Sequence, residues 1–126
     1  MTGQATFDAN VLETLRSRPE VSIRTSRNPR RPVTIWIVVV DDAVFVRSVQ
    51  GPRGKWYLAA KADGEATLVI GQQELPVRVT PVTDPVAVDA VSRAILSKYA
   101  ASPYAKTMVS DETVPTTLRL DAGPPP

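Results

Sequence analysis

The chain contains no cysteine and no histidine among its 126 residues. Without cysteine it has no disulfide, no thiolate nucleophile and no zinc or iron–sulfur site of the thiolate kind. Without histidine it has no Ser-His-Asp triad, no histidine proton relay and no histidine-ligated metal. An enzyme built from this chain must use Lys, Tyr, Asp, Glu or hydroxyl groups, or take its chemistry from an organic cofactor.

Long hydrophobic runs and a strong net charge are also missing. The longest apolar run, Ile35 to Val40, has six residues, whereas a membrane-spanning helix needs roughly 20. The N-terminal segment has no basic stretch followed by an apolar one, so we expect no secretory signal and a cytoplasmic location. The net charge is only +2, and no recognition helix or RNA-binding aromatic motif is visible, which argues against a nucleic-acid partner.

The remaining composition is that of an ordinary globular protein. Apolar residues make up 43% of the chain and charged residues 22%, and the length is close to that of a common single domain. The last residues, DAGPPP, have nothing to bury. We therefore expect one domain over residues 1–120 and a disordered tail over 121–126.

Hydrophobic periodicity predicts an α+β fold with one antiparallel sheet. Turn residues at Asn28-Pro29, Asp41-Asp42 and 71–73 separate apolar segments and predict hairpins. Strands of this number and apolarity commonly curl into a small barrel. The expected elements are a helix over 8–18, strands over 20–26, 32–40 and 43–49, a helix over 55–63, strands over 66–70 and 74–82, a helix over 84–99, a short helical turn over 102–110 and a last strand over 113–120.

Basic residues are concentrated in the first half of the chain. If the first two hairpins are adjacent, these side chains form a basic rim suited to phosphate or carboxylate. For Arg27, Arg30 and Arg31 the alternative is a solvated turn. The cluster consists of Arg16, Arg18, Arg24, Arg27, Arg30 and Arg31, followed by Arg47, Arg53 and Lys55.

Two further segments carry candidate binding residues. In AVFVRSV, Arg47 lies between apolar residues, so its charge needs either a ligand anion or a structural carboxylate. Its neighbour Ser48 is able to donate to a phosphate or to satisfy a sheet edge. In GPRGKWY (51–57), glycines, cations and aromatics occur together; Trp56 stacks on a planar ligand or belongs to the core.

These pieces together resemble the FMN-binding split-barrel superfamily, in particular the deazaflavin-dependent nitroreductase group and an uncharacterised family close to it. The resemblance covers about residues 20–82. It rests on a T-x-R turn at Thr25, a T-x-W strand at Thr34, a V-x-V-R-S strand ending at Ser48 and a W-Y helix start at Trp56. It implies a small antiparallel split β-barrel with flanking short helices, usually a homodimer, that holds a flavin-type cofactor.

The resemblance also implies which residues hold FMN or a deazaflavin coenzyme, with no metal involved. Some of these positions match the turn near the cofactor tail, some the strand beneath the ring, and some the loop and helix start near the phosphate. They are Arg24, Thr25, Arg27, Arg31, Thr34, Trp36, Arg47, Ser48, Arg53, Lys55, Trp56 and Tyr57.

The leading functional hypothesis is a dimeric oxidoreductase that passes hydride from the cofactor to a planar organic substrate, such as a quinone or a nitro compound. Tyr57, Tyr99 and Tyr104 are the candidate proton donors, and the sequence does not choose among them. The alternative is a cofactor-free binding module for an anionic small molecule. It is motivated by the turn SRNPRRP, because the corresponding nitroreductase turn usually contains glycine.

Overall fold

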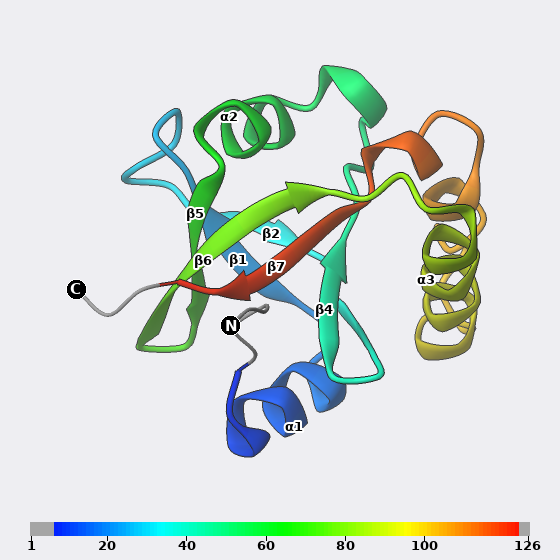
Figure 1. Cartoon of the computed structure of the whole chain (residues 1–126), viewed down its shortest axis with the longest axis horizontal. Helices are drawn as coiled ribbons and strands as arrows, with labels where there is room; N and C mark the ends of the chain where they lie inside the picture. The colour runs from blue at the N-terminus through cyan, green and yellow to red at the C-terminus, as the bar shows by residue number, and fades with distance from the viewer. Residues whose placement is uncertain (1–6, 124–126) are drawn as a thin grey trace.

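One antiparallel sheet of seven strands forms the centre of the molecule in the computed structural model, which describes residues 7–123 (Figure 1). The order of the strands across the sheet is β2-β1-β5-β6-β7-β4-β3. Their bounds are β1 Val21–Arg24, β2 Val33–Ile35, β3 Val38–Val40, β4 Ala43–Val46, β5 Glu65–Ile70, β6 Gln73–Pro81 and β7 Leu118–Ala122.

The sheet curls into a barrel because β2 and β3 form its two opposite edges, yet only Trp36 and Ile37 separate them in the chain. The prediction of one continuous strand over 32–40 is therefore wrong. β2 pairs with β1, and β3 pairs with β4. The break has a physical cause, since one straight strand cannot pair with both edges of an open sheet. The predicted α+β split barrel with flanking short helices is confirmed.

The predicted turns are present. Asp41 and Asp42 both have positive φ, 49° and 65°, and they join β3 to β4 in register. Two successive residues with positive φ make the tight turn whose twist matches that of an antiparallel hairpin. Gly71, with φ 61°, turns the chain between β5 and β6.

Three helices flank the barrel: α1 (Ala9–Ser17), α2 (Lys55–Asp63) and α3 (Pro85–Lys98). α1 and α2 lie at opposite ends of the barrel and α3 lies outside it, beside β4 (Figure 1). In the described residues, none of the helices is long and apolar enough to cross a membrane. Short 3₁₀ turns occur at η1 (Gly51–Arg53), η2 (Thr107–Val109) and η3 (Val114–Thr116).

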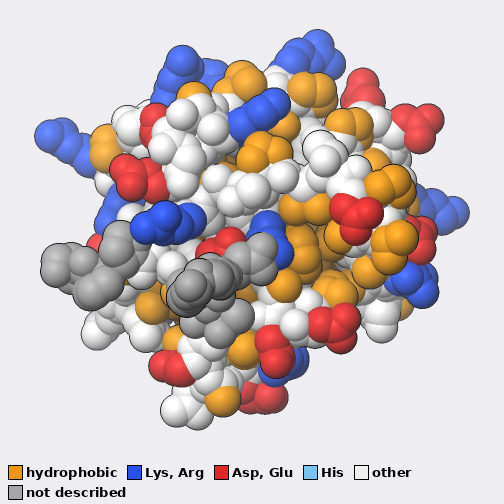
Figure 2. All heavy atoms as spheres, viewed as in Figure 1, with side chains coloured by type: hydrophobic (Ala, Val, Ile, Leu, Met, Phe, Trp, Pro, Cys, Tyr) orange, Lys and Arg blue, Asp and Glu red, His pale blue; other side chains and the backbone are white. Residues whose placement is uncertain are grey.

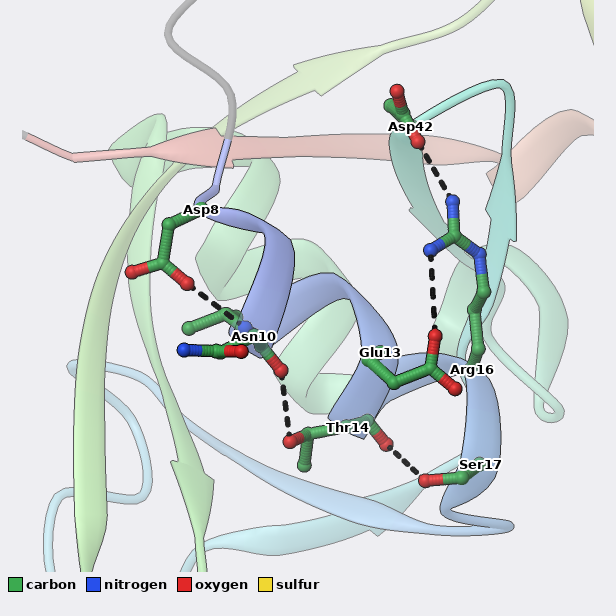
Figure 3. Close-up of polar contacts among 8 residues, drawn as sticks. Asp8, Asn10, Glu13, Thr14, Arg16, Ser17 and Asp42 are labelled. Atoms are coloured by element: carbon green, nitrogen blue, oxygen red, sulfur yellow. Dashed lines mark hydrogen bonds and ion pairs between the residues drawn. The ribbon is translucent and has the colours of Figure 1, made fainter.

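Capping residues explain where the helices begin and end. Asp8 accepts a hydrogen bond from the Val11 N–H and starts α1, and Asp84 does the same for α3 through Ala87. Figure 3 shows the Asp8 cap and, near the other end of α1, Arg16 between Glu13 and Asp42. Gly64, with φ 69°, ends α2.

The C-terminal segment differs from the prediction. Residues 113–120 were expected to form the last strand, but η3 occupies Val114–Thr116 and β7 begins only at Leu118. β7 then continues through Asp121 and Ala122, which we had assigned to the tail, because it pairs with β6 over 77–81. The remaining tail, 124–126, lies outside the described residues.

Two hydrophobic clusters lie on opposite faces of the curled sheet. The inner cluster fills the barrel and includes Leu15, Ile23, Leu68 and Leu118, each fully buried. The outer cluster lies between α3 and the β3–β4 hairpin, and Phe45 belongs to it. Because side chains alternate along a strand, Phe45 and the residue two positions later, Arg47, are expected to share the outer face.

Candidate functional site

A pocket of about 520 Å³ lies beside the break between β2 and β3, within the roughly 300–1,000 Å³ typical of small-molecule sites. Its walls come from the β2 edge, the end of β4, the start of α2 and the segment after α3. They are lined by Glu20, Val33, Thr34, Ile35, Trp36, Arg47, Val49, Gln50, Lys55, Trp56, Tyr104 and Met108.

The aromatic wall of the pocket is held from behind. The rings of Trp36 and Tyr99 are parallel, with an interplanar angle of 1° and centroids 3.9 Å apart. Tyr99 is buried and covers one face of the indole, which leaves the opposite face of Trp36 to any planar group in the pocket.

Side chains at the end of α3 satisfy the backbone at the break. The Tyr99 hydroxyl donates to the carbonyl of Pro19 at 2.6 Å and accepts the N–H of Ile37 at 3.1 Å. Lys98 Nζ donates to the carbonyls of Ile37 and Leu15 at 2.7 and 2.8 Å. Burial lowers the pKa of Lys98 to about 8 and raises the pKa of Tyr99. We call Lys98 and Tyr99 the clamp.

Arg47 points to α3, as strand alternation predicts, and is only 1% exposed. Its Nε donates to Thr117 Oγ1 at 2.8 Å, and one terminal nitrogen donates to Ser92 Oγ and the Met108 carbonyl at 2.9 and 3.0 Å. The other terminal nitrogen donates to the Val88 carbonyl at 2.9 Å. No carboxylate in residues 7–123 forms an ion pair with it. Desolvation lowers its pKa to about 10.

The start of α2 contributes a second cation to the pocket. Lys55 and Trp56 both line it, and the preceding residue, Gly54, provides no side-chain cap for the helix. Ser48 is buried on the inner side of β4, and its Oγ has no hydrogen-bond partner. That hydroxyl occupies the space that a side chain at Gly54 would need. The free N–H groups of a helix start favour an anion.

The structure brings some of the sequence-predicted residues together and keeps others apart. Thr34, Trp36, Arg47, Lys55 and Trp56 line the pocket. The other predicted residues do not line it. Arg27, Arg31 and Arg53 are exposed, Tyr57 lies in the inner cluster, Ser48 is buried beside Gly54, and Arg24 and Thr25 line a second hollow.

The second hollow lies on the β5–β6 side of the barrel, and one of the residues that line it, Arg24, forms an ion pair. Arg24 contacts both carboxylate oxygens of Glu74, at 2.5 and 3.2 Å. The guanidinium lowers the pKa of Glu74, and the hydrogen bond to Glu74 raises the pKa of Arg24. Thr25 hydrogen-bonds Asn28 within the turn. These residues are therefore engaged within the chain.

The basic cluster read from the sequence is dispersed in space. Arg16 pairs with Asp42 at 2.7 Å (Figure 3), and Arg24 pairs with Glu74. On the face drawn in Figure 2, lysine and arginine side chains are scattered among acidic ones and do not form one basic surface. Proximity along the sequence did not predict proximity in the fold.

Several pocket residues were not predicted as ligand-binding residues. Glu20, Val49, Gln50 and Met108 line the pocket, but they come from three separate parts of the chain and share no motif. Tyr104 was named only as a candidate proton donor. Of the three tyrosines it is the one that lines the pocket, whereas Tyr57 and Tyr99 are buried. In the described residues no group of three or more carboxylates is placed to hold a metal ion.

Solved structures of the same fold support this architecture. The conserved hypothetical protein Rv2991 from Mycobacterium tuberculosis superposes with a TM-score of 0.66 and 12% identity over 98% of this chain and 83% of its own. The FAD binding protein from Mycobacterium smegmatis gives a TM-score of 0.55 and 16% identity over 97% and 94%. At these identities the likeness concerns the fold, and it confirms the split-barrel resemblance.

No curated protein matches the sequence. A family model does match, and it spans residues 11–120, from α1 to β7. That range contains strands β1 to β6, the first part of β7 and every residue that lines the pocket. The chain therefore belongs to the family described as "Uncharacterized protein conserved in bacteria (DUF2255)".

Proposed function

We propose that the pocket binds a flavin-type cofactor, FMN or a deazaflavin, and that the protein is a reductase for planar organic molecules such as quinones or nitro compounds. One observation carries the proposal: a single pocket of about 520 Å³ combines two tryptophans with two cations, Arg47 and Lys55. The fold neighbour described as an FAD binding protein supports it. The absence of cysteine and histidine also favours borrowed chemistry.

The residues of the pocket fit such a group. A flavin-type ring needs an apolar or aromatic wall, which Trp36, Val33 and Met108 offer, and its anionic tail needs donors. Lys55 and the uncapped start of α2 supply cationic and N–H donors. The buried, unpartnered hydroxyl of Ser48 lies against Gly54 at the same helix start.

When bound, the ring supplies the hydride that no side chain of this chain can supply. The chain's own residues orient the ring and screen it from solvent. Trp36, fixed by Tyr99, limits the ring to one stacking face. Tyr104 is 65% exposed and lines the pocket, so its hydroxyl is the one we assign to proton delivery to the substrate.

Cofactor content of the purified protein tests the proposal most directly. We expect flavin or deazaflavin absorbance in the protein as isolated, or saturable binding when FMN or a deazaflavin is added, and release of the same molecule on denaturation, identified by mass spectrometry. Oxidation of the reduced cofactor by a quinone or a nitro compound then measures turnover. A colourless protein unmoved by either cofactor contradicts the proposal.

Lys55 and Arg53 form a matched pair for the same titration. Both are exposed cations at the start of α2, but only Lys55 lines the pocket. Lys55→Gln should weaken FMN binding by about 5- to 10-fold, the scale of one charge-assisted hydrogen bond. Arg53→Gln should leave FMN binding unchanged. Equal losses in the two variants would remove the assignment of Lys55.

The second candidate function is a cofactor-free module that binds an anionic small molecule. A specific observation favours it, because none of the turn residues Arg24, Arg27 and Arg31 lines the pocket. The phosphate of a cofactor would then depend on Lys55 and the helix start alone. Binding of aromatic anions without any binding of FMN or deazaflavin would select this candidate.

We also propose that the protein is a homodimer. Val49 and Tyr104 are 55% and 65% exposed, and both lie in the pocket wall. A second copy that covers them would complete the pocket and bury apolar surface. Light scattering should give twice 13.6 kDa, and a monomer at all protein concentrations would contradict the dimer.

A further inference from the structure

We infer that the pocket holds, at Arg47, the carboxylate of a second planar ligand, so that the substrate is an aromatic or conjugated monoanion. The inference rests on the proposed function only in assigning the pocket as a ligand site. It specifies the chemical class of the substrate that would bind beside the cofactor. In residues 7–123 no carboxylate lies within 4.0 Å of the Arg47 guanidinium, although Glu20 lines the same pocket.

Among the arginines of residues 7–123, Arg47 is the one that is buried, and it has no ion pair. Arg16, Arg24, Arg93 and Arg119 each lie within 4.0 Å of a carboxylate oxygen. Arg47 is buried, and its partners are two hydroxyls and two backbone carbonyls. Neutral oxygens satisfy its N–H groups but do not cancel its charge. A buried charge without a counter-charge is costly.

The position of Arg47 connects that charge to the pocket. It is one of the residues that line the pocket, together with Met108, whose carbonyl it binds, and Tyr104. A ligand anion seated there would provide the missing counter-charge in a place of low solvent exposure. Charge-assisted contacts are stronger in such surroundings than at the surface.

The geometry favours a carboxylate of a second ligand over the phosphate of the cofactor. A guanidinium has five N–H donors, and four of those of Arg47 are already used. Phosphates gather several donors, whereas Arg47 has one left. The better donor set in the pocket is Lys55 together with the uncapped start of α2. The positive charge and single free N–H group of Arg47 therefore suit the carboxylate of a monoanion better than a phosphate.

The direct test compares two molecules of similar shape and different charge. Ligand-detected NMR titrations at pH 7 use 2-naphthoate, which is ionised, and neutral 2-naphthamide, each with and without saturating FMN. We expect 2-naphthoate to bind about tenfold more tightly, the value of roughly one charge-assisted contact. Equal binding of the two molecules would overturn the inference.

Substitution at Ser92 tests the charge without removing Arg47. Ser92 Oγ is 2.9 Å from a terminal nitrogen of Arg47, so Ser92→Asp places a carboxylate beside the guanidinium. The variant should lose the preference for 2-naphthoate and melt at a higher temperature. The control is Ser97→Asp, an exposed position on the same helix, which should keep the preference. A preference that survives in Ser92→Asp would overturn the inference.

Substitutions at Arg47 complete the set. Arg47→Met should abolish the preference and Arg47→Lys should retain part of it, while Arg24→Met, outside the pocket, should change nothing. If Arg47→Met instead abolishes the preference for FMN over riboflavin, the charge belongs to the cofactor phosphate and the inference is wrong. Failure of FMN to bind, with the naphthoate preference intact, would remove the reductase proposal and leave this inference standing.

Discussion

The pocket and the second hollow differ in whether an arginine that lines them has an ion pair. The hollow at β5 and β6 is the larger, about 890 Å³ against about 520 Å³ for the pocket. In the larger hollow Arg24 is paired with Glu74, and Ser26 donates to Asp63 at 2.6 Å. In the pocket Arg47 is buried, and although Glu20 also lines the pocket, no carboxylate of residues 7–123 forms an ion pair with Arg47. The smaller pocket is therefore distinguished from the larger hollow by a buried cation without an ion pair, and not by its volume.

The walls of the pocket and of the larger hollow also differ in their aromatic side chains. The pocket is lined by Trp36 and Trp56, and the first of these is fixed by the clamp behind it. The larger hollow is lined by no aromatic side chain among the described residues. Rigid aromatic walls bind planar molecules at little cost in conformational entropy.

The largest effect is expected when the aromatic wall loses its support. Tyr99→Ala removes the ring stacked on Trp36 and the hydrogen bonds to Pro19 and Ile37. Large-to-small changes of a buried aromatic cost about 3–5 kcal/mol, and chemical denaturation measures this loss. Tyr104→Ala, at the exposed front of the same pocket, should stay within about 0.5 kcal/mol. Similar losses in both variants would show that the clamp is not a support.

A smaller loss is expected from Arg47→Met. The substitution leaves the Met108 carbonyl and the Thr117 hydroxyl without the donor they now have. Unsatisfied buried acceptors cost about 1–3 kcal/mol, which is partly offset because a buried charge is also removed. Urea unfolding of the ligand-free protein measures the balance. A loss above this range would mean that Arg47 is chiefly a structural link to α3.

The clamp also predicts a dependence of stability on pH. Burial lowers the pKa of Lys98 to about 8 in the folded protein, against 10.4 for an ordinary lysine. Between these values the unfolded chain binds more protons, so stability rises with pH from about 8 towards 10. The raised pKa of Tyr99 acts in the opposite direction above about 10. Lys98→Met should remove this rise in stability between about pH 8 and 10, measured by chemical denaturation. A rise that persists in the variant would show that Lys98 does not cause it.

Local patterns predicted the elements well because local interactions determine them. Asp8 and Asp84 cap the helices they were expected to start, and Asp41-Asp42 forms the expected turn. The strand break at Trp36 was not predictable from composition, because Ile35 to Val40 is apolar throughout. It follows from closure of the barrel, in which β2 and β3 occupy opposite edges.

The pocket was predictable in part. Trp36, Arg47, Lys55 and Trp56 were identified because cations and aromatics in strands or at a helix start carry a local signal. Met108 and Glu20 were missed, because only the return of the chain after α3 and the packing of β1 bring them to the pocket. Arg24 lines the second hollow and not the pocket, and its partner there, Glu74, is 50 residues away in sequence, so no local pattern could place it.

The smallest effect is expected at Arg24, and it decides whether the two hollows are separate. The Arg24–Glu74 pair is on the surface, where ion pairs contribute little because water and salt screen them. Arg24→Gln should therefore leave the urea midpoint and FMN affinity unchanged, and raised salt should make no difference between variant and parent. Glu74→Gln serves as the matched control, since it breaks the same pair from the other side. If Arg24→Gln weakens FMN binding severalfold while Glu74→Gln does not, Arg24 contacts the ligand. The larger hollow would then belong to the site, and the contrast between paired and unpaired charge would no longer separate the two.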